Sequence, residues 1–144
     1  MGRPENYFIG REGEERIKAL LYEAGCEIEE GEPNGYPDFI FIRGMVRWGV
    51  ECKTMKGVHA EGEVGMAKVS REEFHGMRGI RDEGLKSCLI VEVRPRGFKA
   101  MDYLYLFVSW EAVEERYKKT SPDQVSLSLW WVLRNGVNLE WWLA

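Results

Sequence analysis

The residues of this chain best placed to do chemistry are two carboxylates and one lysine. Asp38 follows Pro37 at the start of an apolar run, and Glu51 and Lys53 lie within the next apolar run. Oxygen ligands without a cluster of histidine or cysteine favour magnesium or manganese over zinc. The three side chains therefore suggest a divalent-metal site with an amine beside it.

Two short β-strands must position these side chains. Residues 38–42 and 46–53 are rich in β-branched and aromatic side chains. The pair Gly44-Met45 between them suits a tight turn with glycine in the first position. This spacing predicts a β-hairpin.

The hairpin brings the two acids together. A chain that folds about its central turn places Asp38 directly opposite Glu51, with Cβ atoms about 5 Å apart. Like charges placed in this way destabilise a sheet, so we expect a cation or a proton between them. Lys53 shares the face of Glu51, whereas Cys52 points to the opposite face of the strand.

A helix is expected before the hairpin. The apolar spacing predicts it over residues 10–24, and Gly25 suits the left-handed position that follows a helix. Glu14 lies at the edge of the buried face, an unusual place for an acid, although the helix dipole favours an acid near a helix N-terminus in any case. The buried stripe consists of Ile17, Leu20, Leu21 and Ala24.

The hairpin, as it stands here, resembles the PD-(D/E)xK nuclease superfamily. The resemblance implies that Asp38 and Glu51 hold magnesium, that the backbone carbonyl of Cys52 can join them, and that Lys53 orients or activates the attacking water. The preceding helix looks like the first helix of the archaeal Holliday junction resolvases of this superfamily. In those proteins an acid at the position of Glu14 completes the catalytic and metal-binding set.

The resemblance covers residues 10–93 and implies an α/β, restriction-endonuclease-like fold, with a mixed sheet flanked by helices. The expected element order agrees: helix, strand, hairpin, a helix from Ser70 to Glu83 that begins with a capping box, and a strand at residues 89–93. We expect one domain over residues 1–144, with a core at 10–93 and an extension at 100–144.

The extension is expected to contain a strand at residues 103–108, a helix at 110–119 and a C-terminal β-hairpin. Residues 126–133 and 137–143 flank Asn135-Gly136, a strong signal for a two-residue turn. Such a hairpin is apolar on both faces, and its indoles are Trp130, Trp131, Trp141 and Trp142. A homodimer contact would cover the second face; stacking on unpaired bases is the alternative.

The charge distribution is compatible with DNA as a partner. The net charge is −4, but residues 43–99 taken alone are net positive, and such a region can bind phosphates on an otherwise acidic protein. A mixed, solvated surface is the alternative. Candidate contacts to the DNA backbone are Lys56, Lys68, Arg71, Arg78 and Arg81. His59 lies in a glycine-spaced segment that we expect to form a loop over the site.

Composition excludes several other classes of protein. Cys26, Cys52 and Cys88 are odd in number and widely spaced, which predicts buried, reduced thiols instead of a disulfide framework or zinc site. The chain shows neither a signal peptide nor an apolar run long enough to cross a membrane. We therefore expect a soluble, cytoplasmic protein.

Together these features predict a magnesium-dependent DNA endonuclease that hydrolyses phosphodiester bonds and is selective for DNA structure, like a Holliday junction resolvase. Manganese is expected to substitute for magnesium. Two alternatives stay open from the sequence. One is a sequence-specific or end-directed nuclease of the same fold, and the other is a DNA-binding module without catalysis, which need not keep Asp38, Glu51 and Lys53 together.

Overall fold

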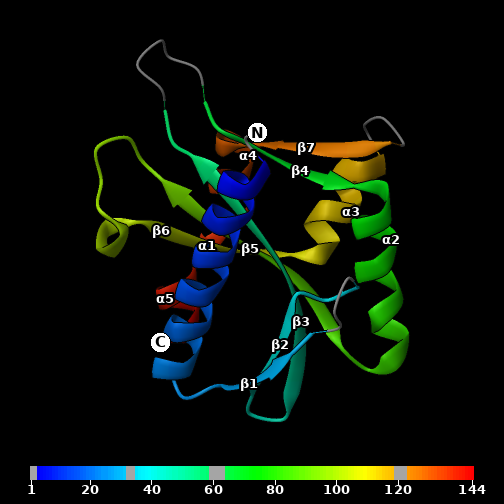
Figure 1. Cartoon of the computed structure of the whole chain (residues 1–144). Helices are drawn as coiled ribbons and strands as arrows, with labels where there is room; N and C mark the ends of the chain where they lie inside the picture. The colour runs from blue at the N-terminus through cyan, green and yellow to red at the C-terminus, as the bar shows by residue number, and fades with distance from the viewer. Residues whose placement is uncertain (1–2, 32–34, 59–63, 119–122) are drawn as a thin grey trace.

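The computed structural model describes residues 3–31, 35–58, 64–118 and 123–144, with side chains from residue 10 onward (Figure 1). Its helices and strands are, in order, α1 (Arg3–Glu23), β1 (Glu27–Glu30), β2 (Phe39–Arg43), β3 (Val46–Lys56), β4 (Met66–Ser70), α2 (Arg71–Gly79), η1 (Ile80–Glu83), β5 (Lys86–Arg94), η2 (Ala100–Asp102), β6 (Leu104–Ser109), α3 (Trp110–Lys118), β7 (Gln124–Ser128), α4 (Leu129–Asn135), β8 (Val137–Asn138) and α5 (Leu139–Leu143). The predicted loop histidine, His59, lies outside the described residues.

A six-stranded mixed sheet forms the centre of the molecule, in the order β1-β2-β3-β5-β6-β8. Strands β3 and β5 run parallel, and the other neighbouring pairs are antiparallel. A separate two-stranded sheet pairs β4 with β7. The sequence reasoning did not predict β4.

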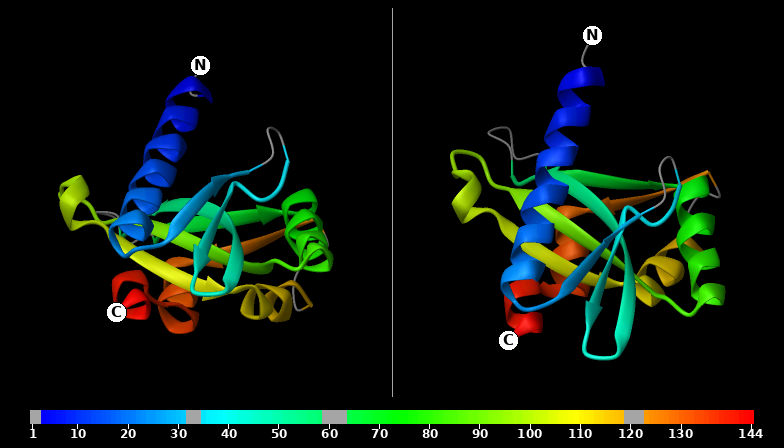
Figure 2. Two further views of the ribbon diagram at one scale, coloured as in Figure 1. Left: turned by 90° about the horizontal axis from the view of Figure 1, so that it is seen from below. Right: turned by 60° about the horizontal axis from the view of Figure 1, so that its bottom comes forward.

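Two hydrophobic clusters cover the two faces of the sheet. One joins α1 and α5 to the sheet through buried residues that include Ile17, Phe39, Val50 and Leu139. The other joins α2, α3, α4 and the β4–β7 sheet to the opposite face. Figure 2 shows α1 and α2 on opposite sides of the β2–β3 hairpin. The hairpin therefore lies where both helices can contribute side chains to one site.

The β2–β3 hairpin has the predicted register. Phe39 pairs with Val50, and the backbone N–H of Asp38 donates to the Val50 carbonyl over 2.9 Å. Gly44 in the turn has a φ of +63°, a conformation that glycine adopts without steric cost. The local turn signal and the alternation of side chains were sufficient to predict this element.

Helix α1 begins earlier than predicted, at Arg3, and ends at Glu23. Gly25 has a φ of +92° and terminates the helix as expected. Ile17 and Leu21 are fully buried. Ala24 is exposed and does not belong to the buried stripe.

Gly13 brings α1 close to the sheet. A Cβ atom at this position would lie 2.7 Å from Cγ2 of Thr54 and 3.2 Å from a carboxylate oxygen of Glu92. The absence of a side chain at Gly13 thus fixes the distance between α1 and β3, at the residue before Glu14.

The predicted C-terminal β-hairpin is wrong. The segment instead forms β7, α4, β8 and α5. The Ser128 hydroxyl accepts from the N–H of Trp131, and the Asn138 side chain accepts from the N–H of Trp141, so each caps a short helix. Gly136 has a φ of −102° and ends α4, and Asn135-Gly136 is therefore a helix end and not a hairpin turn.

The four C-terminal tryptophans divide into two groups. Trp130 and Trp141 are 53% and 75% exposed. Trp131 and Trp142 pack against the two hydrophobic clusters. One domain therefore covers only half of these indoles.

All three cysteines are free, as predicted, and Cys26 and Cys88 are buried, but Cys52 is only partly buried because it lines the cleft described below. Among the described residues, no helix has the length and apolar character that a membrane span requires.

Candidate active site

A cleft of about 410 Å³ lies between α1 and α2, above the start of β2 and the middle of β3. It contains all four residues predicted to act in catalysis. Its lining residues are Gly10, Arg11, Glu14, Glu15, Lys18, Glu30, Asp38, Glu51, Cys52, Lys53 and Glu73. The structure thus brings the predicted site together and adds residues that the sequence reasoning did not assign to it.

Asp38 lies at the centre of the acidic group. Its Oδ2 accepts a hydrogen bond of 2.8 Å from the backbone N–H of Cys52, which fixes the carboxylate against β3. A carboxylate oxygen of Glu14, a carboxylate oxygen of Asp38 and Sγ of Cys52 all lie within 4.8 Å of one another. Burial raises the pKa of Asp38 above its usual value, although the Cys52 N–H acts in the opposite direction.

Glu51 is buried, with 3% of its surface exposed. Its Oε2 has no hydrogen-bond partner among the described residues. Burial, and next the nearby charge of Asp38, raise the pKa of Glu51 well above its usual value. A buried carboxylate oxygen without a hydrogen bond lowers the stability of the fold. A proton or a cation bound to Glu51 would therefore stabilise this part of the structure.

Glu14 reaches the cleft from α1, with its side chain 24% exposed. Burial raises its pKa, Asp38 acts in the same direction, and Lys18 opposes them. Lys18 Nζ lies 3.5 Å from a Glu14 oxygen and 3.2 Å from a Glu30 oxygen. The sequence reasoning missed Lys18, although its position one helical turn after Glu14 was a usable signal.

Lys53 lies between two carboxylates. Its Nζ is 2.7 Å from Oε2 of Glu73 and 3.5 Å from Oε1 of Glu51. Burial alone would lower the pKa of Lys53, but Glu51 and Glu73 outweigh burial and raise it. Lys53 is therefore a charged ammonium at neutral pH. Glu73 is the acidic member of the capping box predicted at the start of α2, and its contact with Lys53 was not predicted, because the sequence does not show which strand α2 packs against.

The donor set fits a hard divalent cation. Three carboxylates with raised pKa values meet in one cleft, and one of them has a buried oxygen without a hydrogen-bond partner in the described part of the chain. Burial raises the pKa of the neighbouring Cys52 thiol well above its usual value. The thiol therefore stays protonated and leaves coordination to oxygen atoms.

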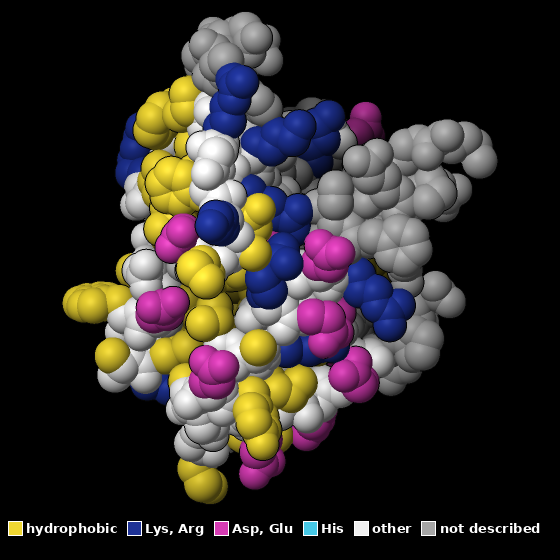
Figure 3. Space-filling view, turned by 60° about the vertical axis from the view of Figure 1, so that its left-hand side comes forward, with side chains coloured by type: hydrophobic (Ala, Val, Ile, Leu, Met, Phe, Trp, Pro, Cys, Tyr) yellow, Lys and Arg dark blue, Asp and Glu magenta, His cyan; other side chains and the backbone are white. Residues whose placement is uncertain are grey.

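The predicted DNA contacts lie on several elements. Lys56, Lys68, Arg71 and Arg78 are exposed. Arg81 instead forms an ion pair with Glu114 and lines a different hollow, with Trp48 and Lys86. Figure 3 shows that Lys and Arg side chains gather in the upper half of one face, so positive charge is concentrated locally.

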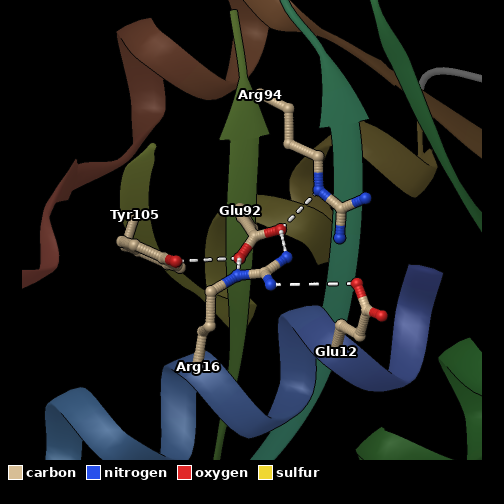
Figure 4. A network of polar contacts seen from close by, with 5 residues as sticks. All are labelled: Glu12, Arg16, Glu92, Arg94 and Tyr105. Carbon is tan, nitrogen blue, oxygen red and sulfur yellow. Dashed lines mark hydrogen bonds and ion pairs between the residues drawn. The ribbon is translucent and has the colours of Figure 1, made fainter. Parts of the chain in front are cut away.

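A second buried carboxylate lies outside the cleft (Figure 4). Glu92 on β5 is fully buried and accepts two hydrogen bonds from Arg16, at 2.8 and 2.9 Å. It also accepts from Tyr105 at 2.8 Å and from Arg94. Burial alone would raise the pKa of Glu92, but these donors outweigh burial and lower it. This network attaches α1 to the sheet on the side away from Glu51.

No protein-family model and no curated protein matches this chain. Among solved structures, the chain is similar to Hjc, a Holliday junction resolvase from the archaeal hyperthermophile Archaeoglobus fulgidus, with a TM-score of 0.66 and 14% sequence identity. The match covers 93% of this chain and 94% of that one. The predicted α/β fold with a mixed sheet is confirmed, and the likeness extends beyond residue 93 into the C-terminal part.

Proposed function

We propose that this protein is a divalent-metal-dependent endodeoxyribonuclease that hydrolyses phosphodiester bonds in branched DNA. The observation that carries the proposal is the convergence of Glu14, Asp38, Glu51 and Lys53 in one cleft, where one buried oxygen of Glu51 has no partner among the residues that the structure describes. Three carboxylates beside a charged lysine suit chemistry at a phosphate, because the carboxylates can bind a cation and the lysine can bind an anionic substrate.

The metal ligands would be the carboxylates of Asp38, Glu51 and Glu14 and the backbone carbonyl of Cys52. Hard oxygen donors favour magnesium, and manganese would substitute. A bound ion supplies a water of lowered pKa and stabilises negative charge on the scissile phosphate. A bound cation would also offset the burial and the nearby charge of Asp38 that together raise the pKa of Glu51.

Lys53 acts in this proposal as a donor. Its raised pKa keeps the ammonium charged, so it cannot accept a proton from water at neutral pH. It can donate hydrogen bonds that orient the attacking water and can stabilise charge that develops on the phosphate. Its role is thus electrostatic and positional, not that of a general base.

Branched DNA is the proposed substrate because a solved structure to which this chain is similar is that of a Holliday junction resolvase. Exposed Lys56, Lys68, Arg71 and Arg78 would contact DNA phosphates. Arg81 would do so only after exchanging its Glu114 partner for a phosphate.

A homodimer is also proposed, since Trp130 and Trp141 remain exposed on α4 and α5. Large exposed aromatic side chains commonly mark an interaction surface. Light scattering should give twice the monomer mass, and Trp130→Ser with Trp141→Ser should give a folded monomer. A parent protein that is monomeric at high micromolar concentration would contradict the dimer.

The decisive test of function is a cleavage assay with junction, flap, linear duplex and single-stranded DNA. Cleavage should require magnesium or manganese, fail in excess chelator, and be fastest on the branched forms. Preference for linear duplex or free ends would support the sequence-specific or end-directed alternative. DNA binding without cleavage in either metal would support the non-catalytic module.

A further inference from the structure

We propose that Glu73 is a positioning residue that holds the ammonium of Lys53 in the active site and connects it to helix α2. The catalytic part of this inference rests on the proposed nuclease function. The geometric part, that Glu73 fixes Lys53, can be tested without cleavage.

The two carboxylate oxygens of Glu73 have different partners. Oε1 accepts from the backbone N–H of Ser70 over 2.8 Å, which forms half of the capping box of α2. Oε2 accepts from Nζ of Lys53 over 2.7 Å. The capping bond fixes the position and orientation of the carboxylate, so Oε2 presents a pre-organised acceptor to the lysine.

Glu73 is also the nearer of the two acids that contact Lys53. The distance from Nζ to Glu51 is 3.5 Å, longer than the 2.7 Å to Glu73. Both members of the Lys53–Glu73 pair are largely shielded, with side chains 19% and 22% exposed. Screening by solvent is therefore weaker than for a surface ion pair, and the contact restricts a long, flexible side chain.

The Lys53–Glu73 pair leaves one oxygen of Glu51, Oε2, available for another role. If Lys53 were bound to Glu51 alone, the ammonium would occupy the carboxylate that is predicted to bind the metal. Glu73 holds the ammonium on the α2 side of the cleft, and Oε2 of Glu51 remains without a partner among the described residues. Glu73 thus holds the lysine beside Oε1 of Glu51 and leaves Oε2 of Glu51 to the proposed cation.

Helix α2 also carries Arg71 and Arg78, which are exposed and are proposed to contact DNA. Because Glu73 belongs to the first turn of this helix, it connects the proposed DNA-binding element directly to Lys53. A shift of the α2 N-terminus on DNA binding would move the ammonium with it.

Glu73→Gln is the variant that tests this role. Glutamine is accepted at this position of a capping box, and its carbonyl oxygen can still accept from the Ser70 N–H. It removes the negative charge that faces Lys53. Ser70→Ala is the matched control, because it breaks the other half of the capping box and leaves the Glu73 carboxylate in place.

The first measurement is the rate at which an N-hydroxysuccinimide acetate acetylates Lys53 without metal, followed by mass spectrometry. Release of the ammonium from Glu73 should make this rate several-fold higher in Glu73→Gln, while Ser70→Ala should match the parent. Equal acetylation rates in Glu73→Gln and the parent would overturn the proposal, whether or not the protein cleaves DNA.

The second measurement separates positioning from binding. With magnesium, the single-turnover cleavage rate of Glu73→Gln should fall between about 10- and 100-fold, as expected for a misplaced catalytic group. Junction affinity measured with calcium and the binding of manganese alone should stay within about twofold of the parent. Loss of manganese binding equal to that of Asp38→Asn would make Glu73 a metal ligand and overturn the positioning role.

A parent protein that cleaves no DNA would refute the proposed function but not the geometric claim, which the acetylation rates decide. Faster acetylation together with an unchanged cleavage rate would overturn the catalytic part alone. Equal losses of activity in Glu73→Gln and Ser70→Ala would assign the effect to helix capping and would also overturn it.

Discussion

Glu51 and Glu92 are both buried, on adjacent parallel strands, but their surroundings differ. Glu92 is fully buried and accepts hydrogen bonds from Arg16, Arg94 and Tyr105. Glu51 is 3% exposed, faces two other acids, and has one oxygen without a partner among the described residues. The pKa of Glu92 is lowered and that of Glu51 is raised.

The difference distinguishes a carboxylate whose hydrogen bonds are supplied by the protein from one that is available to a proton or a cation. Burial acts on both acids in the same direction, so the sign of each pKa shift depends on the partners. Glu92 has the donors that an ionised carboxylate needs, and its network is complete in itself. Glu51 has Lys53 3.5 Å from one oxygen and, among the described residues, no donor for the other, so a proton or a cation in the cleft would stabilise it.

The largest expected effect is on stability, at Glu92. Glu92→Ala should lower the free energy of unfolding by about 3 kcal/mol, because it leaves the charges of Arg16 and Arg94 partly buried without their carboxylate. Urea denaturation measures this. Glu12→Ala, at the exposed end of the same network, should change stability by less than about 0.5 kcal/mol. If Glu92→Ala lowered the free energy of unfolding as little as Glu12→Ala, Glu92 would not have the structural role that distinguishes it from Glu51.

The second effect is on activity. Lys53→Ala should slow cleavage by about 10²–10³-fold, the usual effect of removing one group that stabilises developing charge. Junction affinity in calcium and manganese binding should stay close to those of the parent. Lys118→Ala, an exposed lysine far along α3, is the control. Cleavage at the parent rate by Lys53→Ala would reduce Lys53 to a structural residue.

The third test measures how much magnesium stabilises the folded protein through the carboxylates of the cleft. Free magnesium at 100 times its dissociation constant should stabilise the parent by about 2.7 kcal/mol through binding to the folded state. The gain should shrink in Asp38→Asn, which keeps an acceptor for the Cys52 N–H. Without metal, this variant should be as stable as the parent or more so, by up to about 1 kcal/mol. Strong metal-free destabilisation with retained cleavage would make Asp38 structural.

The smallest effect is a pH dependence of opposite sign for the two acids. The folded-state pKa of Glu51 is raised, so metal-free stability should decline as pH rises above about 4.3, the value of an unperturbed glutamate. The folded-state pKa of Glu92 is lowered, so its contribution should be lost as pH falls below that value. Thermal melts of Glu51→Gln should show a shallower decline between pH 5 and 8. An unchanged decline would assign the pH dependence to other groups.

Local signals were sufficient to predict the centre of the site. The turn at Gly44 and the alternation of side chains fixed the register of β2 and β3, and that register determines where Asp38 and Glu51 lie. The end of α1 followed from Gly25 in the same way.

Competing local signals explain the error at the C-terminus. Asn135-Gly136 is a hairpin signal, but Ser128 and Asn138 are helix caps, and the caps prevail because α4 and α5 bury Leu129, Val132 and Leu139 against the sheet.

Long-range contacts could not be predicted. Glu73 meets Lys53 across 20 residues, and Arg16 meets Glu92 across 76. No local periodicity connects such pairs, so the sequence alone predicted neither the Glu73 partner of Lys53 nor the attachment of α1 to the sheet.

The close approach of α1 to the sheet at Gly13 predicts that substitutions of this residue are poorly tolerated. Any larger residue there would place a Cβ within 2.7 Å of the Thr54 methyl group, and α1 could accommodate it only by moving outward. Glu14, the next residue, would then withdraw from the cleft. In a complete mutational scan scored by cleavage, Gly13 would therefore be as intolerant as the acids themselves, although it has no side chain to bring to the reaction.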